Sequence, residues 1–194
     1  GARLTILHVF LTRPAVDMPP VPMTDADRQR LTADLRRLAA RVPVDVPLDL
    51  RVTEAGDIHR EILTQAEMVT ADLLVLGTHG RSGFERLMLG SVAERVVRMA
   101  PCPTMVVPRR AADVTPDEPV TFRRILCPVV FSTASTRAVR LAMSLAEEAN
   151  AQLMLLHVIQ IPPELQGESM AAEVDLDRIR AAASADAVKH LQAL

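Results

Sequence analysis

Aromatic residues are almost missing from this chain. Tryptophan and tyrosine are absent and phenylalanine occurs four times, so a platform on which nucleic-acid bases could stack is not expected. The formal net charge is −2, and the 22 Lys and Arg residues form no basic block, whereas nucleic-acid-binding domains carry a basic patch. These two shortages argue against nucleic acid as the main partner.

Long apolar runs are missing as well. No run approaches the roughly 18 residues that a membrane helix needs, and the first residues lack the basic and then apolar pattern of a secretion signal. We therefore expect no membrane partner and a cytoplasmic location. Cysteine is scarce, and Cys102 and Cys127 each precede a proline. They are typical of small buried residues in a reducing compartment, with a disulfide between them as the alternative.

The chain does have length, apolar content and an internal repeat. With 194 residues, of which 49% are hydrophobic, it can bury a substantial core in one domain or two. Residues 1–10 (GARLTILHVF) resemble residues 150–159 (NAQLMLLHVI), and proline follows both segments. A repeat of such long period indicates duplicated domains rather than a solenoid, whose period is about 20–50 residues.

Apolar runs alternate with helical patterns in both copies. The first copy predicts strands near 3–10, 48–54, 72–77 and 103–108, and helices within 23–41, 57–69 and 91–99. The second predicts strands at 124–130 and 152–159, a helix from Ser132 or Thr133 to Glu148, and a helix from about Glu173 to the end. Asp57 is the expected N-cap of the helix near 57–69. Buried strands with intervening helices indicate an α/β fold with a doubly wound parallel sheet.

Glycines gather between the strand at 72–77 and the helix at 91–99. The segment Gly77-Thr78-His79-Gly80 is followed, after nine residues, by Gly90-Ser91. Glycine lets the backbone turn sharply and expose its N–H groups, and a helix N-terminus attracts anions. Strand, glycine loop and helix start together predict a phosphate-binding cradle, with a solvated connecting loop as the alternative.

Other phosphate and catalytic motifs fit this loop less well. A Walker-type loop needs a lysine directly after its last glycine, but Lys189 is the only lysine in the chain. The dinucleotide fingerprint places its glycines near the first strand of its unit. The run 80–83 (GRSG) is one residue too short for the G-x-S-x-G nucleophile elbow. We therefore assign no catalytic residue, and slow ATP hydrolysis without a dedicated base is the most that we expect of enzymatic activity.

The glycine spacing resembles the ATP-binding signature of the universal stress protein family. The surrounding sequence is similar too, over residues 74–83 (LVLGTHGRSG), 89–97 (LGSVAERVV) and 101–107 (PCPTMVV). The resemblance implies a Rossmann-like fold of the adenine nucleotide alpha hydrolase-like type, here as a partial tandem repeat. It also implies an ATP-binding stress-response or regulatory protein whose ligand is ATP, alone or with Mg²⁺.

The resemblance further implies which residues contact the ligand. Val9 and Leu76, at two strand ends, would line the adenine pocket. His79 and Arg81 are candidates for phosphate contacts, the alternatives being a histidine bonded to the loop backbone and an exposed arginine. No histidine has a second ligand at the helical spacing of a zinc site, so no metal centre is expected. The backbone amides that would meet the phosphates, with the Ser91 hydroxyl as a further donor, belong to Gly77, Gly80, Gly90, Ser91 and Val92.

Against the family pattern both copies are incomplete. We expect a first unit at 1–110 that lacks its first strand and helix, a linker at 111–122, and a partial second unit at 123–194. The family's first strand lies mid-sheet, so its absence leaves two half-sheets. Either the chain is part of a longer tandem protein, or the strand at 124–130 fills the gap. The family's ribose-binding aspartate has Val130 at its place in the second unit, which argues against nucleotide binding there.

Three classes of function stay open at this stage. The first is an ATP-binding regulatory protein, the second a dimerisation scaffold of the same fold without a nucleotide, and the third an ATP-using enzyme of a related α/β fold. The apolar strand at 103–108, bounded by prolines, suits a sheet edge that pairs with another unit. We therefore expect a homodimer or pseudo-dimer through this strand.

Overall fold

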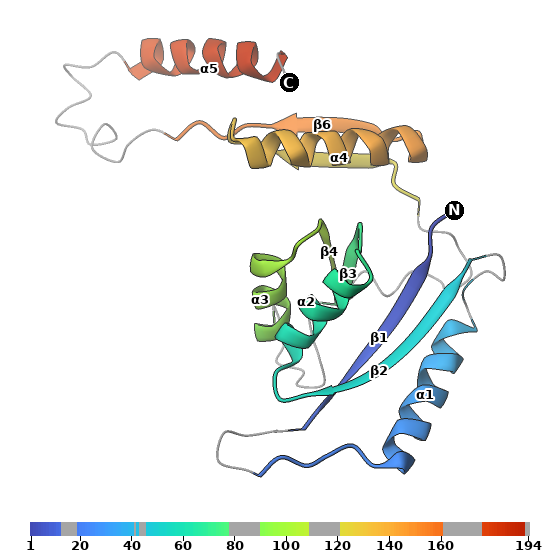
Figure 1. Ribbon diagram of the computed structural model, residues 1–194. Helices are drawn as coiled ribbons and strands as arrows, with labels where there is room; N and C mark the ends of the chain where they lie inside the picture. Colours follow the sequence, from blue (N-terminus) through green and yellow to red (C-terminus); the bar gives the residue numbers. More distant parts are fainter. Residues whose placement is uncertain are drawn as a thin grey trace. The chain divides into compact units, whose positions relative to one another are not determined.

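The computed structural model describes residues 1–12, 19–40, 42, 46–77, 90–108, 121–160 and 176–192. The chain divides into two compact units, Gly1–Pro116 and Asp117–Leu194. Helices and strands alternate in both units (Figure 1). In chain order the elements are β1 (Leu4–Leu11), α1 (Asp25–Ala39), β2 (Leu48–Ala55), α2 (Ile58–Met68), β3 (Leu74–Gly77), α3 (Ser91–Met99), β4 (Thr104–Val107), β5 (Arg124–Pro128), α4 (Thr133–Ala149), β6 (Gln152–Leu156) and α5 (Leu176–Gln192).

Side-chain caps start three of the helices. Thr24 and Asp27 form a reciprocal capping box before α1, in which the Asp27 amide donates to the Thr24 hydroxyl over 3.1 Å. The hydrogen bonds from Thr24 lower the pKa of the Asp27 carboxyl. Asp57 caps α2 and Ser132 caps α4, which confirms both predictions. Such caps satisfy backbone N–H groups that have no partner inside the helix.

The first unit holds two separate pairs of parallel strands. β1 pairs with β2 from Leu4 opposite Leu48 to Leu11 opposite Ala55. β3 pairs with β4 and ends at Gly77 opposite Val107. These pairs match the half-sheets expected in this unit. Helix α1 packs on β1 and β2, while α2 contacts both β1 and α3.

The second unit is built on one parallel pair, β5 with β6. Helix α4 packs against both strands, and their contact forms the core of this unit. The predicted strand at 152–159 ends earlier, at Leu156, which lies opposite Pro128, the last residue of β5. The ring nitrogen Nδ1 of His157 lies 2.9 Å from the carbonyl oxygen of Val129. The residues buried in this core are Cys127, Val129, Val139 and Ala142.

The two cysteines are free thiols, so the disulfide alternative is wrong in this structure. Cys127 belongs to the core, as predicted, while Cys102 is half-buried beside β4. Burial, and then the nearby charge of Asp72, raises the pKa of the Cys102 thiol. The thiolate is the reactive form of cysteine, so this environment disfavours reaction at Cys102.

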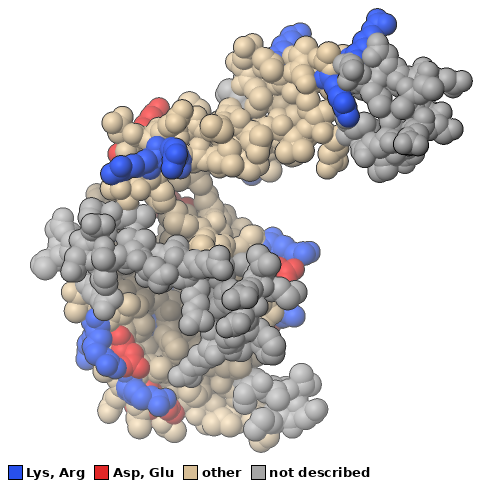
Figure 2. Space-filling view, turned by 180° about the vertical axis from the view of Figure 1, so that it is seen from behind, with Lys and Arg blue, Asp and Glu red and all other residues tan. Residues whose placement is uncertain are grey.

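Charge is spread over the surface of the first unit in small groups of both signs. On the face drawn in Figure 2, acidic and basic side chains lie beside each other. Two such pairs lie on helices, Arg30 with Asp27 at 3.0 Å and Arg98 with Glu94 at 3.1 Å. None of the described helices is both long and apolar enough to cross a membrane.

Candidate functional site

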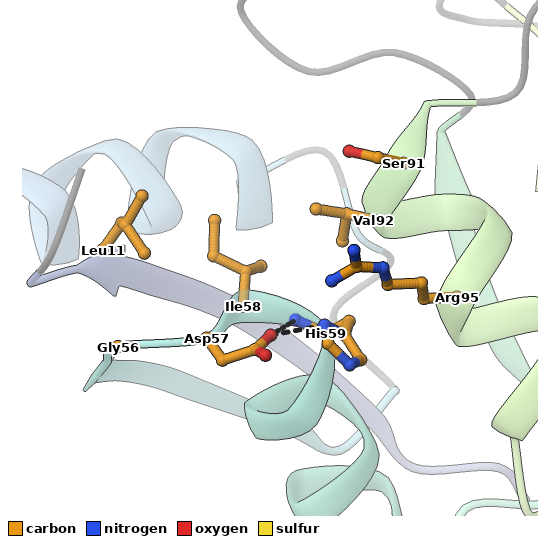
Figure 3. A pocket seen from close by; sticks show the side chains of 8 residues that line it. All are labelled: Leu11, Gly56, Asp57, Ile58, His59, Ser91, Val92 and Arg95. Atoms are coloured by element: carbon orange, nitrogen blue, oxygen red, sulfur yellow. Dashed lines mark hydrogen bonds and ion pairs between the residues drawn. The ribbon is translucent and has the colours of Figure 1, made fainter. Parts of the chain in front are cut away.

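A cavity of about 270 Å³ lies in the first unit (Figure 3). It forms where β1 ends, where β2 turns into α2, and where α3 begins. Ligand sites of parallel α/β folds lie outside the carboxyl ends of the strands, which is the position of this cavity relative to β1 and β2. The residues lining it are Leu11, Gly56, Asp57, Ile58, His59, Ser91, Val92 and Arg95.

Among the four helices whose N-cap residue the structure describes, α1 to α4, α3 is the one without a side-chain cap. Its N-cap is Gly90, and no side chain bonds to the first amides. These amides point out of the helix N-terminus together with the positive end of the helix dipole. Ser91 and Val92 follow directly and line the cavity. The local structure thus offers unpaired donors to an anion instead of to the protein's own side chain.

Asp57 and His59 form the wall opposite α3. The Asp57 carboxylate accepts a hydrogen bond from the His59 amide over 3.1 Å and also pairs with the His59 ring at Nδ1. This pairing fixes the orientation of an imidazole whose side chain is only 10% exposed. The same carboxylate lies 3.8 Å from the Arg60 guanidinium. The Asp57 carboxylate therefore interacts with the first amides of α2 and with the side chains of His59 and Arg60.

Arg95 extends from α3 toward the cavity (Figure 3). It lies one helical turn after Ser91, so the two side chains share a face of the helix. Within the part of the chain that the structure describes, its guanidinium has no hydrogen-bond or ion-pair partner. Arg98, on the same helix, is paired with Glu94. Arg95 is thus a cation at the cavity whose charge no described side chain balances.

The residues predicted for nucleotide binding are only partly brought together. Ser91 and Val92 line the cavity and Gly90 caps the helix beside it. Val9 lies within β1, and Leu76 and Gly77 end β3, so these three do not line the cavity. The predicted contacts that lie outside the described residues are His79, Gly80 and Arg81.

Sequence reasoning missed three polar residues of the cavity. Asp57 was predicted as a helix cap, not as a cavity residue, and His59 had no assigned role. Arg95 carried one usable signal, since it follows Ser91 by four residues, which is the spacing of one helical face. Among the described residues, no group of three His, Cys, Asp or Glu side chains is placed to hold a metal ion.

Val130 is the residue that the family resemblance sets at the place of a ribose-binding aspartate in the second unit. Val130 follows β5 and is 73% exposed. Its amide donates to the Ser135 hydroxyl over 3.0 Å. An exposed valine side chain offers no hydrogen bond to a sugar.

Comparison with known proteins places the chain in a family. The sequence model of the universal stress protein family matches residues 1–108 and 121–193. A universal stress protein from Thermus aquaticus is 35% identical over 109 residues, which are 55% of this chain and 78% of that protein. One from Methanocaldococcus jannaschii is 57% identical over 47 residues, 24% of this chain and 28% of the relative. One from Mycolicibacterium smegmatis is 37% identical over 112 residues, 55% of this chain and 36% of the relative.

A solved structure from Pseudomonas aeruginosa that carries the universal stress protein name supports the fold. It aligns with a TM-score of 0.56 and 17% identity, over 97% of this chain and 59% of that chain. The present chain thus spans a part of the length of several relatives, 28% and 36% in two of them. The chain belongs to the universal stress protein family, and its parallel strands and helices form the Rossmann-like α/β fold.

Proposed function

We propose that this member of the universal stress protein family binds ATP in its first unit and works as a stress-response regulator. The observation that carries the proposal is the start of α3. There Gly90, Ser91 and Val92 of the glycine motif present uncapped amides beside a cavity. A helix start of this kind binds phosphate through its N–H groups and its dipole.

In this proposal the bound ATP contacts residues of both strand pairs in the first unit. The phosphates lie at the amides of Gly90, Ser91 and Val92, with the Ser91 hydroxyl as a further donor. Gly77 and the loop residues His79, Gly80 and Arg81 complete the phosphate contacts, and Mg²⁺ neutralises part of the phosphate charge. Val9 and Leu76 contact the adenine ring. No residue is assigned as a catalytic base, so binding, rather than turnover, is the proposed activity.

Isothermal titration calorimetry of the chain with ATP and Mg²⁺ tests this function. We expect saturable binding with one nucleotide per chain, because Val130 leaves the second unit without a ribose partner. GTP is the matched control, since it carries the same phosphates on a different base. Equal heats for ATP and GTP would show a phosphate site without adenine recognition, and no binding of either at millimolar concentration would refute the proposal.

A second candidate is a dimerisation scaffold without a nucleotide. It is favoured by the exposed, apolar Val130, two residues after the end of β5. Native mass spectrometry of the purified protein separates the two candidates, because a nucleotide-binding chain retains bound nucleotide mass and a scaffold does not.

A further inference from the structure

One residue of the second unit has a backbone conformation that its side chain disfavours. Phe131 follows β5 and has a φ of 55°, in the left-handed region. Among the described residues that are not glycine, Thr70 and Asn150 share a positive φ, and asparagine tolerates this region better than an aromatic residue does. A bulky side chain stays in such a conformation only where its surroundings hold it there. The contacts of Phe131 must therefore stabilise this conformation.

The ring of Phe131 contacts two imidazoles that belong to different elements. His157 comes directly after β6, and its ring centroid lies 4.4 Å from that of Phe131. His190 lies near the end of α5, and its ring centroid is 5.1 Å from that of Phe131. Phe131 also packs on the core of this unit, as does Leu191 of α5. The Phe131 ring thus joins the segments that follow both strands to the last helix.

Polar contacts orient the two imidazoles. The Nδ1 atom of His157 lies 2.9 Å from the carbonyl oxygen of Val129. The Nδ1 atom of His190 lies 2.9 Å from the carbonyl oxygen of Asp186, whose carboxylate is 3.4 Å away. A carbonyl oxygen only accepts hydrogen bonds, so both Nδ1 atoms donate in these contacts. Each imidazole therefore has one side fixed by its own segment and presents its ring to Phe131.

Helix α5 has little apolar surface of its own to bury. Among the residues of α5 whose side chains the structure describes, the least exposed ones are spaced by four residues and are Ala183, Ala187 and Leu191. Two of these three carry a single methyl group, and Val188 is 52% exposed. Helices take most of their stability from packing, and segments with few buried apolar contacts open locally before the rest of a protein. The contact between Phe131 and His190 is therefore a large part of what holds α5 in place.

We propose that α5 is a strap of the second unit, held closed by the contacts of the Phe131 ring with His157 and His190. These contacts lie at the carboxyl ends of β5 and β6, the edge where parallel α/β folds hold ligands. In the closed state the chain's own side chains occupy part of this edge. Release of α5 uncovers the Phe131 ring. The inference does not depend on nucleotide binding by the first unit.

Hydrogen–deuterium exchange of the full chain, followed by mass spectrometry, tests the strap. The readout is the exchange rate of the amides in α5 relative to those in α4. Phe131→Ala should raise this ratio at least about tenfold, because both ring contacts and apolar burial are lost. His190→Ala should raise it about three- to tenfold, because it removes one ring contact and leaves Phe131 on the core.

Two control variants make matched changes away from the contact. Phe122→Ala removes the same ring from a residue that precedes β5 and is 37% exposed. Lys189→Ala changes the neighbour of His190 on α5, which is also exposed. Each should alter the exchange of α5 by less than about twofold, as expected of surface substitutions.

A third variant separates the ring from the backbone conformation. Phe131→Gly removes the ring, and glycine adopts a positive φ without strain. It should release α5 as Phe131→Ala does, whereas α5 that stays protected in Phe131→Gly would overturn the proposal. Unchanged exchange of α5 in His190→Ala would overturn it too, even if Phe131→Ala is too unstable to purify. Equal increases in α4 and α5 in both alanine variants would show that Phe131 is only a core residue.

Discussion

Residue 90 determines what the first amides of α3 contact. Thr24, Asp57 and Ser132 each place a side-chain oxygen on the first amides of their own helices. Gly90 has no side chain and makes no such bond. Glycine is a slightly weaker N-cap than aspartate or serine, by a few tenths of a kcal/mol. Glycine at this N-cap therefore lowers the stability of α3 slightly and leaves its first amides free for the proposed phosphate.

Replacing Gly90 by aspartate should separate stability from binding. The new carboxylate would cap α3, so the unfolding free energy should stay the same or rise by about 0.3 kcal/mol. It would also occupy the amides and repel phosphate, so ATP affinity should fall at least about tenfold. Urea denaturation and calorimetry measure the two effects. Gly90→Ser is the control, because it caps the helix without adding charge and should weaken binding less. Equal binding by both variants and the unaltered chain would show that α3 does not hold the phosphates.

At the scale of elements, α3 is anchored by one buried stripe. Val96 is completely buried, at 0% exposure, and Ala93 is buried one turn before it. The next residue, Val97, is 42% exposed. Because α3 contacts α2, this stripe brings Ser91 and Arg95 toward the turn that carries Asp57. The packing of two helices, and not the glycine motif alone, thus builds the cavity.

The neighbouring valines of α3 allow a matched test of this packing. Val96→Ala removes buried methyl groups and should lower the unfolding free energy by about 1–3 kcal/mol, through lost burial and a residual void. Val97→Ala makes the same chemical change at an exposed site and should cost less than about 0.5 kcal/mol. Urea denaturation of both variants gives the comparison. Similar losses at the two positions would mean that α3 does not pack through Val96.

The sequence allowed the elements to be predicted better than the cavity. Apolar runs located the strands, and the bounds Ser91–Met99 of α3 were predicted as observed because the glycine before it and Pro101 after it mark both ends. The cavity depends on how α2 packs against α3 and β1, and sequence periodicity says nothing about such contacts. From the sequence, His59 is therefore an isolated histidine on a helix. In the structure it is buried and its ring pairs with Asp57.

At the scale of the whole molecule, the described strands form three separate parallel pairs. An isolated pair of strands is marginal in water unless further strands or helices cover it. Helices pack on β1 and β2 and on β5 and β6, while Val75 in β3 is 56% exposed. Apolar strands with open edges favour pairing with additional strands. Among the described residues, each pair thus retains both exposed apolar side chains and an edge that another strand could use.

Self-association through the strand at 103–108 is the prediction that follows at this scale. β4 is short, lies between Pro103 and Pro108, and exposes 37% of Val107. We expect the chain to dimerise in the micromolar range and Val107→Lys to shift it toward the monomer, because an edge lysine opposes strand pairing.

Val97→Lys is the control, since it places the same charge on an exposed valine of α3. Sedimentation velocity over a concentration series measures the association. A chain that is monomeric throughout, or a dimer that both lysine variants weaken equally, would show that β4 is not the contact, and the exposed apolar strands would then need a different partner.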